Sequence, residues 1–313
     1  MRRILALLGL PLLMVSAGCA QAGSGPAGPG QPTDRHQAFE ERAEAVAQQW
    51  RPGAAWTTGY VPLQEPTVLV GDPEFTEETK LAFQAGWYRQ QVPLPPGKPG
   101  DGTIGFADGE LRVPLISATE AYRQLDQGDP PPCPGRPKGP SIPPPADGPD
   151  APVSSEAQVS CVPLTVTDVE LGSATVRTTR GEAQVPAWLF TVEEINAVVA
   201  RAAVAADAIG ALPEPVPPTA PVPPELISAQ DIESVDGTTL NVRLGVGSCD
   251  TEITPLVQEH DHLVVVGGTA VRSTGICDDM LKLEPVTVTL RAPLGARPVL
   301  DVVSAAPLRL AGN

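Results

Sequence analysis

Two proline-rich stretches, at residues 129–152 and 212–224, limit what this chain can fold into more than any other feature. Proline has no backbone N–H and cannot continue a helix or a central strand, so such runs favour extended polyproline II structure. We therefore predict a larger module at 36–205 that carries a proline-rich insertion near 129–152. A stiff linker at 206–224 then leads to a smaller module at 225–313.

The first 19 residues predict an export signal. Arg2 and Arg3 precede an apolar run from Ile4 to Val15, and small residues follow it directly before Cys19. A basic segment, an apolar segment and a small-residue cleavage site are the three parts of a secretory signal peptide. The last part is similar to the lipobox of bacterial lipoproteins. We therefore predict a signal peptide at 1–18, cleavage before Cys19 and lipidation of the Cys19 thiol.

Two other interpretations of this leader are open. An uncleaved anchor helix would need roughly 20 apolar residues to cross the hydrocarbon, whereas this run is shorter and contains Pro11. An ordinary signal peptide with an incidental cysteine would release the chain. Under the lipoprotein interpretation, two acyl chains (palmitate is typical) anchor the chain to the outer face of the cell membrane. Residues 19–35, rich in glycine and proline, then form a flexible tether.

The acidity of the chain excludes some partners. The formal net charge is −16, and removal of Arg2 and Arg3 with the signal would change it to −16 − 2 = −18. A surface this acidic repels nucleic acid phosphates and anionic headgroups, so we expect no nucleic-acid partner. The expected partners are the membrane, through the lipid, and an envelope protein or a small ligand.

Helical periodicity and capping residues predict a few helices. Phe39, Ala43 and Val46 recur at helical spacing, which is typical of an amphipathic helix. Thr76 is a good N-cap and Gly86 a good terminator for another helix. The expected helices span 36–50, 76–85 and 119–125.

Glycine turns predict hairpins in the rest of the chain. Asp108-Gly109 lies inside the extended run 102–116, and Gly181 separates two further extended runs. The run 198–205 is ambiguous between helix and strand. Strands are expected in the smaller module at 227–229, 238–244, 263–266, 286–290 and 299–303. The predicted fold class is α+β, mostly β, with two β-rich modules and one N-terminal amphipathic helix.

Four cysteines remain after Cys19. An even number in an exported chain predicts two disulfides, for which three pairings are possible. Cys133 and Cys161 are 28 residues apart, as are Cys249 and Cys277, and an extended run and a glycine turn follow each second cysteine. We infer that the two halves are variants of one structural unit, each module closed by its own disulfide. Coincidence of the two spacings is the alternative.

Local catalytic motifs are absent from the sequence, which contains no nucleophile elbow, phosphate-binding loop or zinc-protease motif. We predict no catalytic residues and no cofactor. His260 and His262 flank Asp261, and we expect them to be solvated at the entry to a strand. The alternative is that they share one strand face and bind a transition metal, with Asp278 or Asp279 as a third ligand.

Three segments resemble a group of uncharacterised secreted lipoproteins of high-GC Gram-positive bacteria. They are the Ser16-Ala17-Gly18-Cys19 junction and the runs 176–192 and 286–301. The resemblance implies a membrane address and a common β-rich fold. It implies no catalytic residues.

Three functions follow as hypotheses. We favour a membrane-anchored extracytoplasmic lipoprotein that acts as a non-enzymatic binding or scaffolding protein of the cell envelope. The first alternative is a small-molecule or metal receptor associated with a transporter. The second is an envelope enzyme whose site no local motif reveals.

Overall fold

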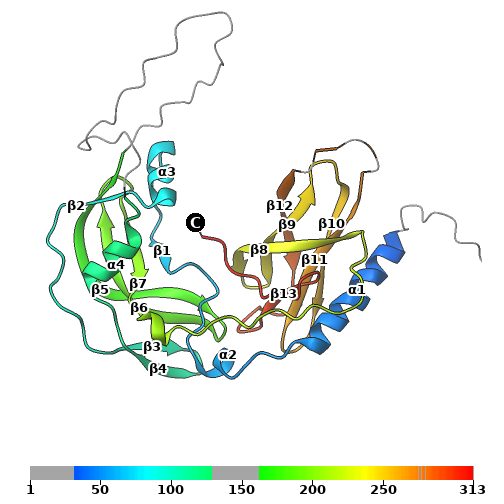
Figure 1. The fold of residues 1–313 in the computed structure, drawn as a ribbon, viewed down its shortest axis with the longest axis horizontal. Helices are drawn as coiled ribbons and strands as arrows, with labels where there is room; N and C mark the ends of the chain where they lie inside the picture. The colour runs from blue at the N-terminus through cyan, green and yellow to red at the C-terminus, as the bar shows by residue number, and fades with distance from the viewer. Residues whose placement is uncertain (1–31, 129–161, 274, 276, 279, 313) are drawn as a thin grey trace, which may run out of the picture.

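The structure is a computed structural model that describes residues 32–128, 162–273, 275, 277, 278 and 280–312. The chain is mostly β and forms two curled sheets. Each sheet makes one lobe, and the C-terminal segment lies between the lobes (Figure 1). The mostly β class predicted from the sequence is confirmed.

The first sheet contains seven strands in the order β1-β7-β6-β3-β4, and β5 pairs with both β6 and β2. The strands are β1 (Thr67–Val70), β2 (Tyr88–Gln90), β3 (Gly102–Phe106), β4 (Gly109–Val113), β5 (Leu164–Thr178), β6 (Gly181–Val192) and β7 (Ala197–Ala202). Positive φ angles at Gly109 (144°) and Gly181 (86°) close the β3–β4 and β5–β6 hairpins, as predicted. The ambiguous run 198–205 is mainly a strand.

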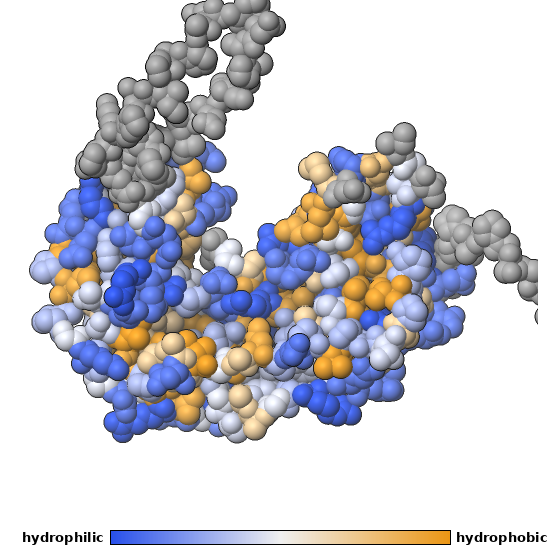
Figure 2. Space-filling model, in the orientation of Figure 1, coloured by the Kyte–Doolittle hydropathy of each residue, from blue (hydrophilic) through white to orange (hydrophobic). Residues whose placement is uncertain are grey.

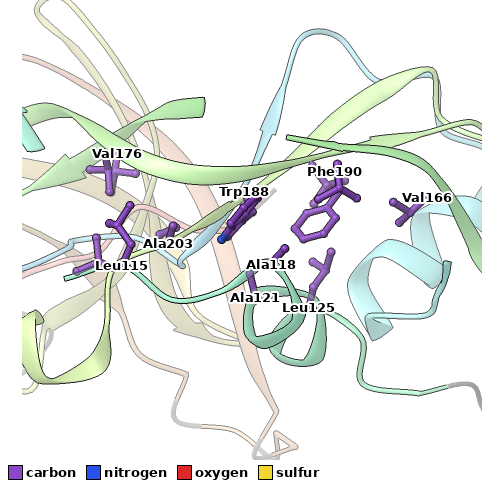
Figure 3. Close-up of a cluster of buried hydrophobic side chains, with 14 of the residues drawn as sticks. Leu115, Ala118, Ala121, Leu125, Val166, Val176, Trp188, Phe190 and Ala203 are labelled. Atoms are coloured by element: carbon purple, nitrogen blue, oxygen red, sulfur yellow. The ribbon is translucent and has the colours of Figure 1, made fainter. Parts of the chain in front are cut away.

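Two short helices, α3 (Glu77–Ala85) and α4 (Ala118–Leu125), lie along this sheet, and a third, α2 (Ala55–Thr58), lies at the junction of the lobes. Thr76 caps α3 by accepting from the backbone N–H of Thr79, and Gly86 ends it with a left-handed φ of 69°. One face of α4 is buried against Trp188 and Phe190 of β6, as Figure 3 shows. The predicted helices 76–85 and 119–125 are confirmed.

The second sheet contains six strands in the order β10-β11-β8-β9-β12, and β13 pairs with β11. The strands are β8 (Leu226–Asp236), β9 (Thr239–Gly247), β10 (Thr251–Glu259), β11 (Val264–Val271), β12 (Leu281–Thr289) and β13 (Val299–Asp301). Strand β11 is buried on both faces, because Val264 and Val266 point into the sheet's own core while Val265 packs under a helix. This explains its continuous apolar run.

That helix is α1 (Pro32–Gln49), which confirms the predicted N-terminal helix. It starts at Pro32, so the last four residues of the expected tether 19–35 are helical. Sequence order assigned the helix to the larger module, but Phe39, Ala43 and Val46 pack against the second sheet. An amphipathic helix is stabilised by whichever apolar surface covers its face, and sequence order does not specify that surface.

Arg42 of α1 also holds the linker between the modules. This buried guanidinium donates to the carbonyl oxygens of Pro218 (3.1 Å) and Ala220 (2.8 Å) in the linker, and to those of Val302 (3.3 Å) and Val303 (3.0 Å). The linker 206–224 contains one 3-10 turn, η1 (Ala206–Ala208), and no further helix or named strand. It is therefore attached to the second lobe by specific contacts.

The C-terminal segment forms a second connection between the two lobes. The backbone N–H of Leu310 donates to the carbonyl oxygen of Leu63 (2.7 Å), and that of Ala311 donates to Ile232 of β8 (2.7 Å). Arg309 pairs with Glu65 at 3.2 Å. Both ends of the described chain thus contact the lobe that is distant from them in sequence.

The inferred structural repeat is wrong at the level of strand pairing. After Cys161, β5 continues through Gly181 into β6, its antiparallel neighbour. After Cys277, β12 pairs with β9, and β13, which follows the turn at Gly295, pairs in parallel with β11. Equal cysteine spacing therefore does not reflect one shared strand arrangement.

Candidate functional site

Only part of the predicted cysteine chemistry falls within the described residues. Cys249 and Cys277 form a disulfide with an S–S distance of 2.01 Å and a Cα–Cα distance of 6.2 Å, as predicted. It links the ends of β9 and β12. Cys133, Cys161 and the lipidation candidate Cys19 lie outside the described residues, as do the signal peptide and the insertion 129–152.

The structure does not assemble the hypothetical histidine metal site. His260 and His262 lie in the turn between β10 and β11 and not on a strand, with their ring centroids 6.1 Å apart. Asp278 accepts a hydrogen bond from Ser248, near the opposite end of β10. Nine strand residues span about 30 Å, so Asp278 cannot join the histidines. Asp279 lies outside the described residues. Among those described, no three His, Cys, Asp or Glu residues are grouped to hold a metal ion.

Next to this turn, Glu259 is a buried carboxylate with a structural role. It accepts from the backbone N–H of Arg291 (2.6 Å) and from Nη1 of Arg297 (3.0 Å). Burial by itself raises the pKa of Glu259, but these hydrogen bonds and the charge of Arg297 outweigh it. The pKa of Glu259 is therefore lowered, and the carboxylate fixes the loop 291–297 to the end of β10.

A cavity of about 460 Å³ lies between the first lobe and the C-terminal segment, and we call it the cleft cavity. The space-filling view shows the notch between the lobes (Figure 2). The walls of the cleft cavity come from β1, the C-terminal ends of α3 and α4, β7 and the chain's last described residues. They are formed by Gln64, Glu65, Thr67, Val68, Leu69, Phe83, Gln84, Gly86, Tyr88, Gln124, Leu125, Gln127, Arg201, Leu310, Ala311 and Gly312.

Arg201 supplies the cationic group of this wall. Its side chain leaves β7 beneath α4, where Nη1 donates to Oγ1 of Thr67 (2.9 Å) and Nη2 donates to Oε1 of Gln124 (3.1 Å). Both partners are neutral. Burial lowers the pKa of Arg201, and the negative charge of Glu65 opposes that shift only partly. None of the ion pairs among the described residues includes Arg201.

Tyr88 lies in the same wall with a buried hydroxyl. Its Oη has no hydrogen-bond partner among the residues that the structure describes. Burial raises the pKa of Tyr88, and the nearby Asp126 and Tyr122 add to this effect. The phenol is therefore neutral at physiological pH and retains hydrogen-bonding capacity that the described chain does not use.

A second, smaller cavity of about 300 Å³ adjoins the cleft cavity and shares Gln64, Val68, Leu69 and Leu310 with it. Arg177 of β5 lines it, opposite Glu233 of β8, and Nη2 of Arg177 reaches the carbonyl oxygen of Gly295 in the other lobe (3.3 Å). Leu310 of the C-terminal segment therefore lines both cavities.

A further groove of about 630 Å³ lies at the junction of α1, α2 and the two lobes. Trp50 and Trp56 meet edge to face there, with ring centroids 5.0 Å apart. Arg180 stacks 3.7 Å from the ring centre of Phe106 and makes a bidentate pair with Asp108. Arg180 is thus paired with Asp108, Arg51 donates to the carbonyl oxygen of Trp50, and the two tryptophans pack against each other.

The cleft cavity is suited to binding. Pockets for small molecules are typically 300–1,000 Å³ and contain a few converging polar groups. The side chains here offer amide, hydroxyl and guanidinium groups, without a paired nucleophile and base within the described chain. None of the described helices is both long enough and apolar enough to span a bilayer.

The chain matches no family model, no curated protein and no solved structure. The geometry of the site therefore carries the functional argument on its own.

Sequence analysis did not identify Arg201, although a signal was present. Arg201 is the only charged residue in the apolar run Val198–Ala205. A charge in a buried strand is costly unless it is paired or used, so a lone arginine there marks a position worth testing. Glu65 and Gln124, which accompany it, lie far from Arg201 in sequence and carry no local signal.

Proposed function

We propose that this protein is a membrane-anchored extracytoplasmic lipoprotein that acts as a non-enzymatic binding or scaffolding protein of the cell envelope. The anchoring part rests on the sequence: a basic and apolar leader, then small residues before Cys19. An acylated Cys19 would tether the two lobes close to the membrane through the segment that precedes α1.

One observation carries the binding part of the proposal. The cleft cavity has about 460 Å³ of space between the first lobe and the C-terminal segment. Three connections hold this segment and the two lobes together. These are the linker held by Arg42, the C-terminal segment, and the contact of Arg177 with Gly295. A site built between firmly joined elements is pre-organised, which reduces the entropy cost of binding.

The cavity also favours the second candidate, a small-molecule receptor associated with a transporter. A scaffold would use an exposed surface, whereas a receptor would enclose its ligand in a cavity such as this one. An envelope enzyme is the least supported candidate. A metal site formed by His260, His262 and Asp278 is excluded, because Asp278 lies near the opposite end of β10 from the two histidines.

Fatty-acid labelling tests the anchoring part. We expect the intact chain to incorporate a labelled fatty acid and to fractionate with membranes, whereas a Cys19→Ala variant should do neither. A Ser24→Ala variant, which alters the neighbouring tether, should behave like the unmodified chain. Equal labelling of the Cys19→Ala variant would refute lipidation at this position.

Site-specific crosslinking in intact envelopes tests the binding part. A photoreactive residue at Gln84, an exposed position at the mouth of the cleft cavity, should capture a reproducible partner. The same residue at Arg112, whose side chain is 78% exposed on β4 outside the cleft cavity, should not. Capture that is identical at both positions, or absent at both, would contradict docking of a protein partner at the cleft.

A further inference from the structure

The second half of the linker is conformationally restricted by its own sequence. Thr219 is the only residue of 212–224 that is neither a proline nor placed directly before one. The proline ring fixes φ at about −65°, and the residue before a proline is confined to extended and polyproline II conformations. The segment therefore loses little conformational entropy when a partner binds it.

The fold holds this segment at three points. Just before it, the backbone N–H of Gly210 donates to the carbonyl oxygen of Tyr60 in the first lobe (2.8 Å). In its middle, Arg42 donates to two carbonyl oxygens. At its end, Nε of Arg272 donates to the carbonyl oxygen of Pro224 (3.2 Å). The segment is therefore fixed on the fold, and Figure 1 shows it passing beside α1.

Side chains of this segment face solvent along one line. Polyproline II has three residues per turn, so Val216, Thr219 and Val222 lie on the same side. All three are exposed, and the exposed fractions of Val216 (66%) and Val222 (41%) are large for a residue type that is usually buried. Exposed prolines extend this apolar surface, and they are Pro215, Pro217, Pro221 and Pro224. We call the exposed side of 215–224 the proline ridge.

The proline ridge has unused hydrogen-bond acceptors and acidic neighbours. Within the described chain, the carbonyl oxygens of Val216 and Val222 accept no hydrogen bond. Glu214 precedes the ridge and Glu225 follows it, and no ion pair among the described residues includes either. Arg51 lines the same small cavity as Glu214 without pairing with it. The ridge therefore suits a partner that offers N–H or O–H donors and positive charge.

We propose that the proline ridge is a docking segment for a protein partner whose groove is lined by tryptophan and tyrosine and bordered by lysine or arginine. Aromatic-lined grooves bind polyproline II segments through apolar packing on the rings, and indole N–H and phenol O–H groups can donate to the backbone carbonyl oxygens. A basic border complements Glu214 and Glu225. A membrane surface fits less well, because anionic headgroups repel an acidic segment.

The location of this docking in the envelope rests on the proposed function, but the proline ridge lies outside the cleft cavity and does not depend on it. Stiffness alone would suffice for a spacer between the modules. It would not require an apolar side that the fold leaves in water, whereas a docking segment requires one.

Photo-crosslinking in intact envelopes that carry the full chain tests the proposal. A photoreactive residue at Thr219 should capture one protein that the same residue at Arg112, exposed on β4, does not. A synthetic peptide of residues 212–224 should compete with this capture. A peptide with alanine in place of every proline should not, because its backbone is no longer restricted. Mass spectrometry should place the crosslinks beside tryptophan or tyrosine of the partner.

Point variants separate the proline ridge from the fold. Val222→Ser should lower the capture from Thr219 by about fivefold, as expected for the loss of one apolar interface contact. Val70→Ser makes the same change at a similarly exposed position on β1 (44%) and should leave the capture unchanged. Glu214→Gln should lower the capture by up to about fivefold at low salt and less at high salt. Both serine variants should unfold at the urea concentration of the unmodified chain.

Several results would overturn the proposal. They are capture from Thr219 that does not exceed capture from Arg112, equal competition by the two peptides, unchanged capture in Val222→Ser, or crosslinks only to lipid or to a second copy of this chain. Capture from Gln84 without capture from Thr219 would keep the proposed binding function and reject the proline ridge. Peptide-sensitive capture from Thr219 without capture from Gln84 would support the ridge and reject docking of a protein at the cleft.

Discussion

Replacing Arg42 by methionine removes the hydrogen bonds that hold the linker while keeping most of the buried side-chain stem. Two of the four carbonyl oxygens that Arg42 contacts, those of Val302 and Pro218, lie in buried surroundings. A buried acceptor that loses its partner costs about 1–3 kcal/mol, which gives about 2–6 kcal/mol for the two.

Part of this loss is offset. Burial lowers the pKa of Arg42, against the opposing effect of the nearby Asp301 carboxylate, which shows that the cation is itself poorly solvated. Removing the charge recovers some of that desolvation cost. The carbonyl oxygens of Ala220 and Val303 are only partly buried and can turn to water. We therefore expect Arg42→Met to lower the free energy of unfolding by about 2–4 kcal/mol.

Urea unfolding monitored by tryptophan fluorescence measures this change, since Trp50 and Trp56 lie directly after α1. Arg112→Met is the matched control, because that side chain is largely exposed and its loss should cost under about 0.5 kcal/mol. If the free energy of unfolding of Arg42→Met lies within about 0.5 kcal/mol of that of the unmodified chain, the hydrogen bonds of Arg42 do not stabilise the fold as argued.

Three further predictions follow from buried groups. Tyr88→Phe removes a buried hydroxyl that has no partner among the described residues, and it should leave the free energy of unfolding unchanged or raise it by up to about 1 kcal/mol. A loss of more than about 1 kcal/mol in urea unfolding would show that the hydroxyl has a hydrogen-bond partner. A Cys249→Ser, Cys277→Ser double variant opens a bridge between residues 28 apart and should lose about 3–4 kcal/mol in the same assay. A loss no larger than that of the Arg112→Met control would contradict a stabilising role for this disulfide. Glu259 has a folded-state pKa below its ordinary 4.5, so its stabilisation is present above that pH and is lost as the pH falls through the folded-state pKa. Glu259→Gln should therefore reduce the acid sensitivity of unfolding. An unaltered pH profile would contradict this assignment.

Signals that act within a few residues were sufficient to predict several elements. Thr76 and Gly86 delimit α3 because a cap satisfies free backbone groups and glycine accepts a left-handed φ. Gly109 and Gly181 fix two hairpins by the same backbone freedom. These effects need no distant partner.

Strand β10 was missed for a physical reason. Pro255 lies in its middle, which locally argues against a strand. In the sheet, however, β10 is an edge strand, as is β12 with Pro285, and an edge strand tolerates a residue without an N–H on its open side. Whether a strand lies at the edge depends on the order of all strands, which no local pattern contains.

The sequence by itself determined the mostly β class, the principal helices and hairpins, the Cys249–Cys277 pair and the prediction of a lipid anchor, because each depends on short-range backbone preference, spacing or a leader. The tertiary structure alone decided that α1 packs on the second sheet and that the C-terminal segment reaches the first. It also brought Arg201 and Glu65 to one cavity. Such contacts depend on which apolar surfaces pack against each other, and the free energy of that packing depends on all the elements of the chain.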